Sequence, residues 1–223
     1  MSRGLWAAVT AFVVAASPAA GQGLADFDYE NLSFRGFGAS IGYASPSAVD
    51  GTAVFGLRAD LGFLGPGLRI VPNLAFWSSA MKGEEVAELE QSVQRLLERE
   101  QDPGVPTPEV DLGTIDRSDL VLGLDAHVVW RVRFGFLTYA GAGAAAHFLN
   151  GGGEAVDGTF VEDLLDSVTA GFNLHGGIEV PLRSWIRTYG EARFEVLDDL
   201  YYPEFRVGVQ LMTTGPAPGE VGP

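Results

Sequence analysis

Eight stretches of about ten residues or slightly more, in which apolar and polar side chains alternate, constrain the fold of this chain more than any other feature. Their hydrophobic period of two, and their content of Val, Phe, Tyr and Gly, are typical of half-buried β-strands and not of helices. A tilted strand of about 9–11 residues also has the length needed to cross the hydrocarbon layer of a membrane. The stretches are Leu32–Tyr43, Thr52–Phe63, Gly67–Trp77, Asp119–Arg131, Gly135–Phe148, Ser167–Val180, Trp185–Val196 and Glu204–Met212.

The connections between these stretches are alternately long and short. The gaps after the second, fourth and sixth stretches are the short ones: Leu64–Pro66, Val132–Phe134 and Pro181–Ser184. The other gaps are longer and polar, and this alternation is typical of a transmembrane barrel with periplasmic turns and outward loops. We therefore predict an all-β fold, an eight-stranded antiparallel up-and-down transmembrane β-barrel, with both termini on the periplasmic side.

The aromatic residues suggest two belts at the levels of the lipid headgroups, where amphipathic rings prefer to lie. The belt expected at the short-turn end contains Phe63, Trp130, Phe134, Phe136 and Trp185. The belt expected at the long-loop end contains Tyr43, Phe76, Trp77, Phe148, Tyr201 and Tyr202. An ordinary core with aromatic residues placed by chance is the alternative.

The segment Lys82–Asp116, between the third and fourth strands, departs from the strand pattern and is strongly acidic. Apolar residues recur at helical spacing over Glu84–Glu100, so we expect a short helix in this loop. The segment holds three basic and ten acidic residues, which places much of the formal net charge of −15 on one outward loop. A second acidic loop, Gly151–Asp166, contains a possible helical turn at Phe160–Leu165.

The pattern of the first residues is typical of a targeting segment. Arg3 precedes the apolar run Leu5–Ala16, and small residues follow at positions suited to signal peptidase, so the mature chain should begin near Ala20 or Gln22. A membrane anchor is the alternative, but the run is shorter than the ~18 residues that an anchor needs. We expect a signal peptide at 1–21, an outer-membrane barrel domain at 22–213 and a tail at 214–223.

The polar face of the strands carries charges of both signs, which can pair across a lumen just wide enough to be filled by side chains. The opposite face has no charge over a full span, as contact with lipid requires, because Arg or Lys near the midplane costs roughly 2–4 kcal/mol. We therefore predict that the polar face points inward, although a soluble lipocalin-like barrel would alternate as well. The predicted polar network of the lumen is Arg58, Asp60, Arg69, Asp125, His127, Arg131, His175, Glu179, Arg187, Glu191, Arg193 and Arg206. Charges alternate along one strand from Arg187 to Glu195, which suggests either a salt-bridged plug or a selective polar path.

Several runs in the second half of the chain resemble a known family. These runs are Tyr139–Gly143, Gly171–Glu179, Tyr189–Phe194 and Phe205–Val209. They are similar to the second half of small outer-membrane barrel domains such as the OmpA barrel, OmpX and OmpW, and the resemblance covers about residues 30–213. It implies the same eight-stranded fold. Members of this family usually end on an aromatic residue, whereas the last stretch here ends near Met212 and a tail follows.

The sequence contains no specific motif for catalysis, cofactor binding or metal binding. The chain has no cysteine, so disulfides, thiolate metal sites and a cysteine nucleophile are excluded. The glycine spacing of Gly141–Ala146 matches the fingerprint of dinucleotide-binding proteins. That fingerprint is followed by a helix, whereas the residues that follow here are typical of a loop. His127, His147 and His175 are widely spaced, and nothing in the sequence places a serine or a metal-ligand set beside them. We therefore expect no enzyme activity, no cofactor and no metal.

The sequence thus predicts a porin-like protein of the Gram-negative bacterial outer membrane with a structural or surface-interaction role. The expected partners are outer-membrane lipids and lipopolysaccharide, contacted by acidic loops, and the barrel-assembly machinery; the barrel is expected to be a monomer. The negative net charge argues against a nucleic-acid partner, because phosphate backbones attract basic surfaces. Two alternatives remain: a narrow channel or small-molecule binder of the outer membrane, and a soluble periplasmic lipocalin-like carrier.

Overall fold

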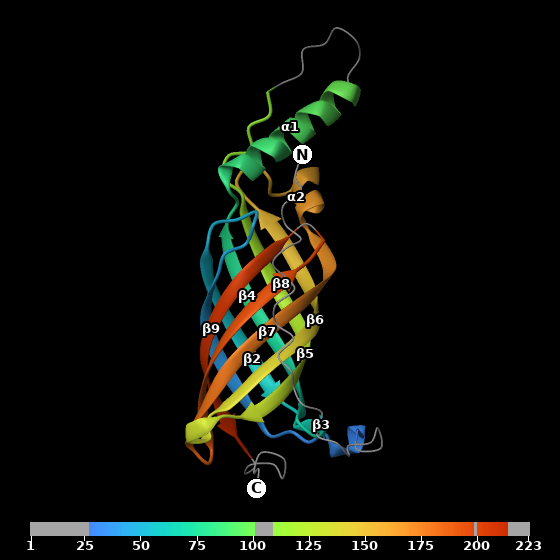
Figure 1. The fold of residues 1–223 in the computed structure, drawn as a ribbon. Coiled ribbons are helices and arrows are strands. Elements are labelled where there is room, and N and C mark those ends of the chain that lie inside the picture. The colour runs from blue at the N-terminus through green and yellow to red at the C-terminus, as the bar shows by residue number, and fades with distance from the viewer. Residues whose placement is uncertain (1–26, 101–108, 199, 214–223) are drawn as a thin grey trace, which may run out of the picture.

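In the computed structural model, which describes residues 27–100, 109–198 and 200–213, the chain forms a closed antiparallel β-barrel with two helices at one end (Figure 1). Strands that follow each other in the chain pair, except for the second and third, which both pair with the fourth, and the first strand pairs with the last over nine residue pairs, from Gly36↔Met212 to Ala44↔Glu204. This closure leaves no free sheet edge, so every strand satisfies its backbone hydrogen bonds inside the barrel, as lipid requires. The predicted signal peptide, residues 1–21, and the predicted tail, 214–223, lie outside the described residues.

The strands and helices follow the predicted order. The strands are β1 Gly36–Ala44, β2 Thr52–Asp60, β3 Phe63–Gly65, β4 Leu68–Ala80, β5 Asp116–Arg131, β6 Leu137–Gly152, β7 Ser167–Arg183, β8 Ile186–Val196 and β9 Tyr201–Met212. The α-helices are α1 Gly83–Glu100 and α2 Phe160–Leu165, and two short 3-10 turns are η2 Tyr29–Asn31 and η3 Arg133–Gly135. Both predicted helical segments are confirmed.

The second predicted strand is divided into β2 and β3 by a break at Leu61 and Gly62. Gly62 has a positive φ of 79°, which glycine adopts without steric cost, and its backbone N–H donates to Asp60 Oδ1 at 2.8 Å. The ladder continues across the break, because Leu61 N–H donates to the carbonyl of Ile70. β2 and β3 both pair with β4, so together they occupy one position in the wall and the barrel has eight strands.

The two faces of the wall lie as the alternation predicts. The outward face is a continuous apolar belt that includes Leu122, Phe172 and Phe205, which are 57, 68 and 67% exposed. The inward face carries the charged side chains, which are almost fully buried. A lipocalin-like barrel would have its apolar face inward, so the alternative of a soluble carrier does not fit this arrangement.

The strands are longer than predicted at the end that carries the helices (Figure 1). β4 continues to Ala80, β5 begins at Asp116, β6 ends at Gly152 and β9 begins at Tyr201. Most residues of the extensions of β4, β5 and β6 are polar or small, and the extension of β9 contains Pro203, so the apolar–polar alternation is weak there. Hydrophobic periodicity therefore underestimates the strands at this end.

The prediction that Trp77 and Tyr202 belong to the aromatic belt is wrong. Trp77 and Tyr202 are each 1% exposed and point into the barrel, where their rings pack edge to face with centroids 6.0 Å apart. Trp77 Nε1 donates to the Tyr202 hydroxyl at 3.4 Å. Both residues lie at positions of β4 and β9 whose side chains face inward, so the alternation of the strand, and not the preference of an aromatic ring for the interface, determines where they lie.

The helix end of the barrel is closed by apolar side chains in two layers. The inner layer lies within the wall, around Trp77 and Tyr202, and includes Val54, Val121 and Leu149. The outer layer joins α1, α2 and the adjoining loops; its buried members are Val86, Val93, Leu112, Ile115, Val156, Val161 and Leu165. None of the described helices is long and apolar enough to cross a membrane.

Candidate functional site

The polar interior of the barrel is the candidate functional site, and eleven of the twelve predicted network residues lie there. The following residues are all buried, with 8% of their surface or less exposed: Arg58, Asp60, Arg69, Asp125, His127, His175, Glu179, Arg187, Glu191, Arg193 and Arg206. Arg131 is the exception: the prediction that it belongs to the polar network of the lumen is wrong. It belongs to the inward-facing series of β5, but it is the last residue of the strand and lies exposed at the short-turn end.

A first cluster, on the short-turn side, gathers three arginines around one carboxylate. Glu179 accepts hydrogen bonds from Arg69 at 2.6 and 3.0 Å, from Arg58 at 2.9 Å and from Arg187 at 3.4 Å. Asp60 lies 3.6 Å from Arg69 and adds the second negative charge. We call these five residues the turn-side cluster; it has three positive and two negative charges.

A second cluster has the opposite balance. Arg193 forms ion pairs with Asp125, with Glu191 at 3.1 Å and with Glu195 at 3.1 Å. Glu191 also accepts a hydrogen bond from the Tyr139 hydroxyl at 2.8 Å. We call Arg193 and its three carboxylates the central cluster. Burying one such charge costs several kcal/mol unless it is paired, so these mutual contacts are what make a charged lumen tolerable.

Nearer the helix end, a histidine connects Glu195 of the central cluster with one further carboxylate, Asp119. His147 Nδ1 lies 2.8 Å from Asp119 Oδ2, and its Nε2 lies 3.9 Å from Glu195 Oε2. Arg206 pairs with Glu204 two residues away on β9. Asp119, His147 and Glu204 are not among the predicted network residues, whereas Glu195 belongs to the charge alternation predicted for its strand. Their inward positions follow from the same alternation, but most of them lie near strand ends where the alternation is hard to read.

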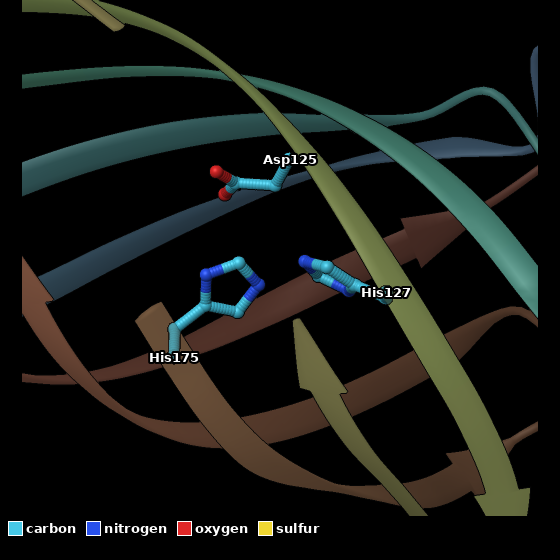
Figure 2. Close-up of side chains that lie close together, drawn as sticks. All are labelled: Asp125, His127 and His175. Carbon is cyan, nitrogen blue, oxygen red and sulfur yellow. The ribbon is translucent and has the colours of Figure 1, made fainter. Parts of the chain in front are cut away.

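Asp125, His127 and His175 converge in the middle of the lumen, as Figure 2 shows. Their tautomers follow from their partners. Arg69 can only donate, so His127 Nδ1, 3.1 Å away, accepts and the proton is on Nε2. Asn173 uses its amide nitrogen for Asp125, so its oxygen accepts from His175 Nδ1 at 2.7 Å and leaves a lone pair on Nε2. Among the described residues, neither histidine Nε2 has a hydrogen-bond partner.

This trio does not fit a transition-metal site as arranged. One ligand atom from each residue lies within 4.8 Å of the others, but those of Asp125 and His127 are already used in hydrogen bonds or carry a proton. His127 presents a proton at Nε2, and both oxygens of Asp125 already accept from Arg193 and from asparagine amides. The chemistry of the donor set therefore favours a hydrogen-bonded filling of the lumen over metal binding.

The glycines of β6 explain the sequence run that resembles a nucleotide-binding fingerprint. A Cβ at Gly141 would lie 2.4 Å from His175 Nε2 and 2.4 Å from the Ala126 carbonyl oxygen. A Cβ at Gly143 would lie 2.0 Å from Asp125 Oδ1. Both positions face the lumen, so these glycines make room for the central side chains, and no helix follows them.

The network surrounds one small interior cavity. The interior cavity lined by Arg58, Asp125, His127, Glu191 and Arg193, among others, has a volume of about 10 Å³, which is the space of roughly one water molecule. Within the described part of the chain, no hydrogen bond joins a serine to any of the three histidines, so the arrangement provides no activated hydroxyl nucleophile.

Comparison with solved structures agrees with this architecture. The barrel is similar to Neisserial surface protein A (NspA), with a TM-score of 0.54 and 12% sequence identity over 79% of this chain and 96% of that one. It is also similar to a major outer-membrane protein of Thermus thermophilus (TM-score 0.49, 12% identity, 80% and 98% of the two chains) and to Ail, the attachment invasion locus protein of Yersinia pestis (TM-score 0.48, 8% identity, 81% and 99%).

No protein-family model matches the sequence, and neither does any curated protein. At 12% identity the likeness to NspA establishes the fold alone. That fold, together with the exposed apolar belt and the closed wall, makes this chain a β-barrel protein of the bacterial outer membrane.

Proposed function

We propose that this protein is a non-enzymatic outer-membrane barrel whose acidic outward cap contacts lipopolysaccharide through divalent cations, while its filled lumen gives the cap a rigid support. The proposal rests on the acidic residues exposed at the helix end of the barrel and on the apolar layers that lie between them and the charged interior. The cap, made of residues 82–100, 109–116 and 151–166, presents exposed acids such as Glu84, Glu88, Glu98 and Asp163, and apolar layers lie beneath it.

The charge of the cap supports a cation-bridged contact. Residues 151–166 hold five acidic residues and no basic one, and residues 82–116 hold ten acidic and three basic residues. Lipopolysaccharide is itself anionic, so direct contact would be repulsive and divalent cations would be needed as bridges. Insertion by the barrel-assembly machinery and a monomeric state complete the proposal; both rest on the fold class.

The cap contact can be tested with the barrel in nanodiscs and lipopolysaccharide on a sensor surface. We expect binding in Mg²⁺ that is lost on chelation and at least fivefold weaker in the double variant Glu84→Gln/Glu88→Gln. The matched control is Asp28→Asn/Glu30→Gln, which removes two exposed acids at the opposite end. Binding that ignores chelation, or equal effects of the two double variants, would contradict the proposal.

The channel alternative has less support. A conducting path needs continuous free volume, and the interior cavity between the charged side chains has a volume of about 10 Å³, with an apolar layer above it. Hydrophobic constrictions of this kind also oppose ion passage by excluding water. We therefore assign the charge alternation on β8 to a salt-bridged plug.

A further inference from the structure

The short-turn mouth of the barrel contains a basic pocket that the cap function does not use. A cavity of about 250 Å³ lies between the end of β5, the start of β6 and the turn that joins β7 to β8. Three arginines, Arg131, Arg183 and Arg187, line it together with Leu137 and Ser184. Arg131 and Arg183 are exposed, whereas Arg187 is 6% exposed and lies deeper.

The charge balance around this pocket is positive. Arg131 and Arg183 form no ion pair with any residue that the structure describes. Arg187 shares Glu179 with Arg58 and Arg69, and its contact, at 3.4 Å, is the longest of the three. The two exposed arginines therefore add two positive charges to the mouth of the barrel, next to Arg187.

The depth of the pocket in the membrane indicates which anion it meets. Trp130 and Trp185 flank it and are 44 and 51% exposed, and Phe134, in the adjacent turn, is 90% exposed. Exposed aromatic rings of this kind mark the headgroup level of a bilayer. Arginine presents a planar fork of donors that matches phosphate in a bidentate way. We propose that Arg131, Arg183 and Arg187 form a phosphate-binding pocket at the periplasmic mouth, which takes the phosphate of a lipid headgroup or free phosphate.

The pocket is built differently from a chance group of surface arginines. Arg187 is held from below by Glu179, so its guanidinium is already positioned before a ligand arrives. Arg183 and Ser184 lie where β7 turns into β8, and Arg131 approaches from β5 across the mouth. A phosphate group would therefore be contacted both from β5 and from the β7–β8 turn, with buried Leu137 of the intervening strand β6 beside it.

The test uses the full barrel folded in a non-ionic detergent that lacks phosphate. Inorganic phosphate is titrated in a calorimeter against chloride at equal ionic strength, and dihexanoyl-phosphatidylglycerol is titrated below its micelle concentration. Saturable binding of either probe supports the site, and binding of the lipid alone identifies the headgroup as the source. If neither probe binds above the chloride control, the proposal is wrong.

Two variants connect the binding to the pocket. We expect Arg131→Gln/Arg183→Gln to bind the probe at least tenfold more weakly, because it removes two of three positive charges. The control Arg95→Gln/Arg99→Gln removes two exposed arginines of α1 at the far end and should bind as the natural protein does. The heat-dependent gel shift verifies that each variant is folded. Equal affinity of the natural protein and Arg131→Gln/Arg183→Gln overturns the proposal.

Discussion

Glu179 is the residue on which the short-turn half of the lumen depends. One carboxylate, 0% exposed, holds Arg58, Arg69 and Arg187. Replacement by glutamine keeps the volume but leaves three buried guanidiniums with Asp60 as their remaining anion in the turn-side cluster. Because breaking a buried ion pair typically costs about 3–5 kcal/mol, we expect Glu179→Gln to lower the free energy of unfolding by about that amount in urea titrations of the vesicle-embedded barrel.

The matched control for this substitution is Glu88→Gln. Glu88 is an exposed acid of α1 and has no side-chain ion pair among the described residues. Exposed substitutions away from special features change stability by about 0.5 kcal/mol or less. Similar urea midpoints for Glu179→Gln and the natural protein would show that the arginines do not depend on this carboxylate.

Gly141 lies so close to the neighbouring strand that a larger residue has no room there. In Gly141→Ala the new methyl group would meet the Ala126 carbonyl oxygen at 2.4 Å, and a backbone atom cannot rotate away as a side chain does. Overpacking of this kind costs about 1–3 kcal/mol. Gly190→Ala is the control, because a Cβ there has no neighbour within 4 Å. Thermal unfolding should separate the two variants, and equal midpoints would contradict the close approach.

The residues of the site are predictable only in part. Alternation correctly places eleven charged or imidazole side chains inside, because a strand has only two faces. It does not say which partners meet, since strand stagger decides that Arg193 reaches Asp125 on β5 while Arg69 reaches Glu179 on β7. It also does not say where the interior ends, which is why the pattern assigns Arg131 to the network.

At the scale of elements, α1 is held by one apolar stripe and not by its own helix propensity. Val93 is 3% exposed within the outer apolar layer, whereas Leu96, one turn further, is 47% exposed. We expect Val93→Asp to release the helix, because a carboxylate cannot be buried there without a partner. Limited proteolysis should cut residues 82–116 at least fivefold faster, while the heat-dependent gel shift of the barrel stays unchanged.

Leu96→Asp makes the same change on the exposed side of the helix and should leave the cleavage rate near that of the natural protein. If both variants are cut equally fast, α1 is not docked through Val93. The existence of α1 and α2 is readable from helical spacing, but their docking onto each other through Val86, Val161 and Leu165 is not. Contacts between two loops far apart in the sequence leave no periodic signal in either one.

At the scale of the whole molecule, charged and apolar side chains are unevenly distributed along the barrel axis. In the function proposed above, an apolar exterior contacts the membrane, a charged interior fills the lumen, the acidic cap faces outward and the basic mouth faces the periplasm. The interior itself changes sign along its length, from three arginines on one glutamate to one arginine on three carboxylates. The internal polarity therefore matches the polarity of the two ends.

This arrangement predicts a barrel that does not conduct. The charged clusters and the apolar layer around Trp77 and Tyr202 close the lumen in series, so an open path requires both to move. In planar bilayers we expect no stable single-channel steps from the natural protein, and none from Val93→Asp, which loosens only the cap. Reproducible steps that vanish on substitution of Arg58 or Glu191 would favour the narrow-channel alternative instead, because they would place the ion path through the clusters that are argued to block it.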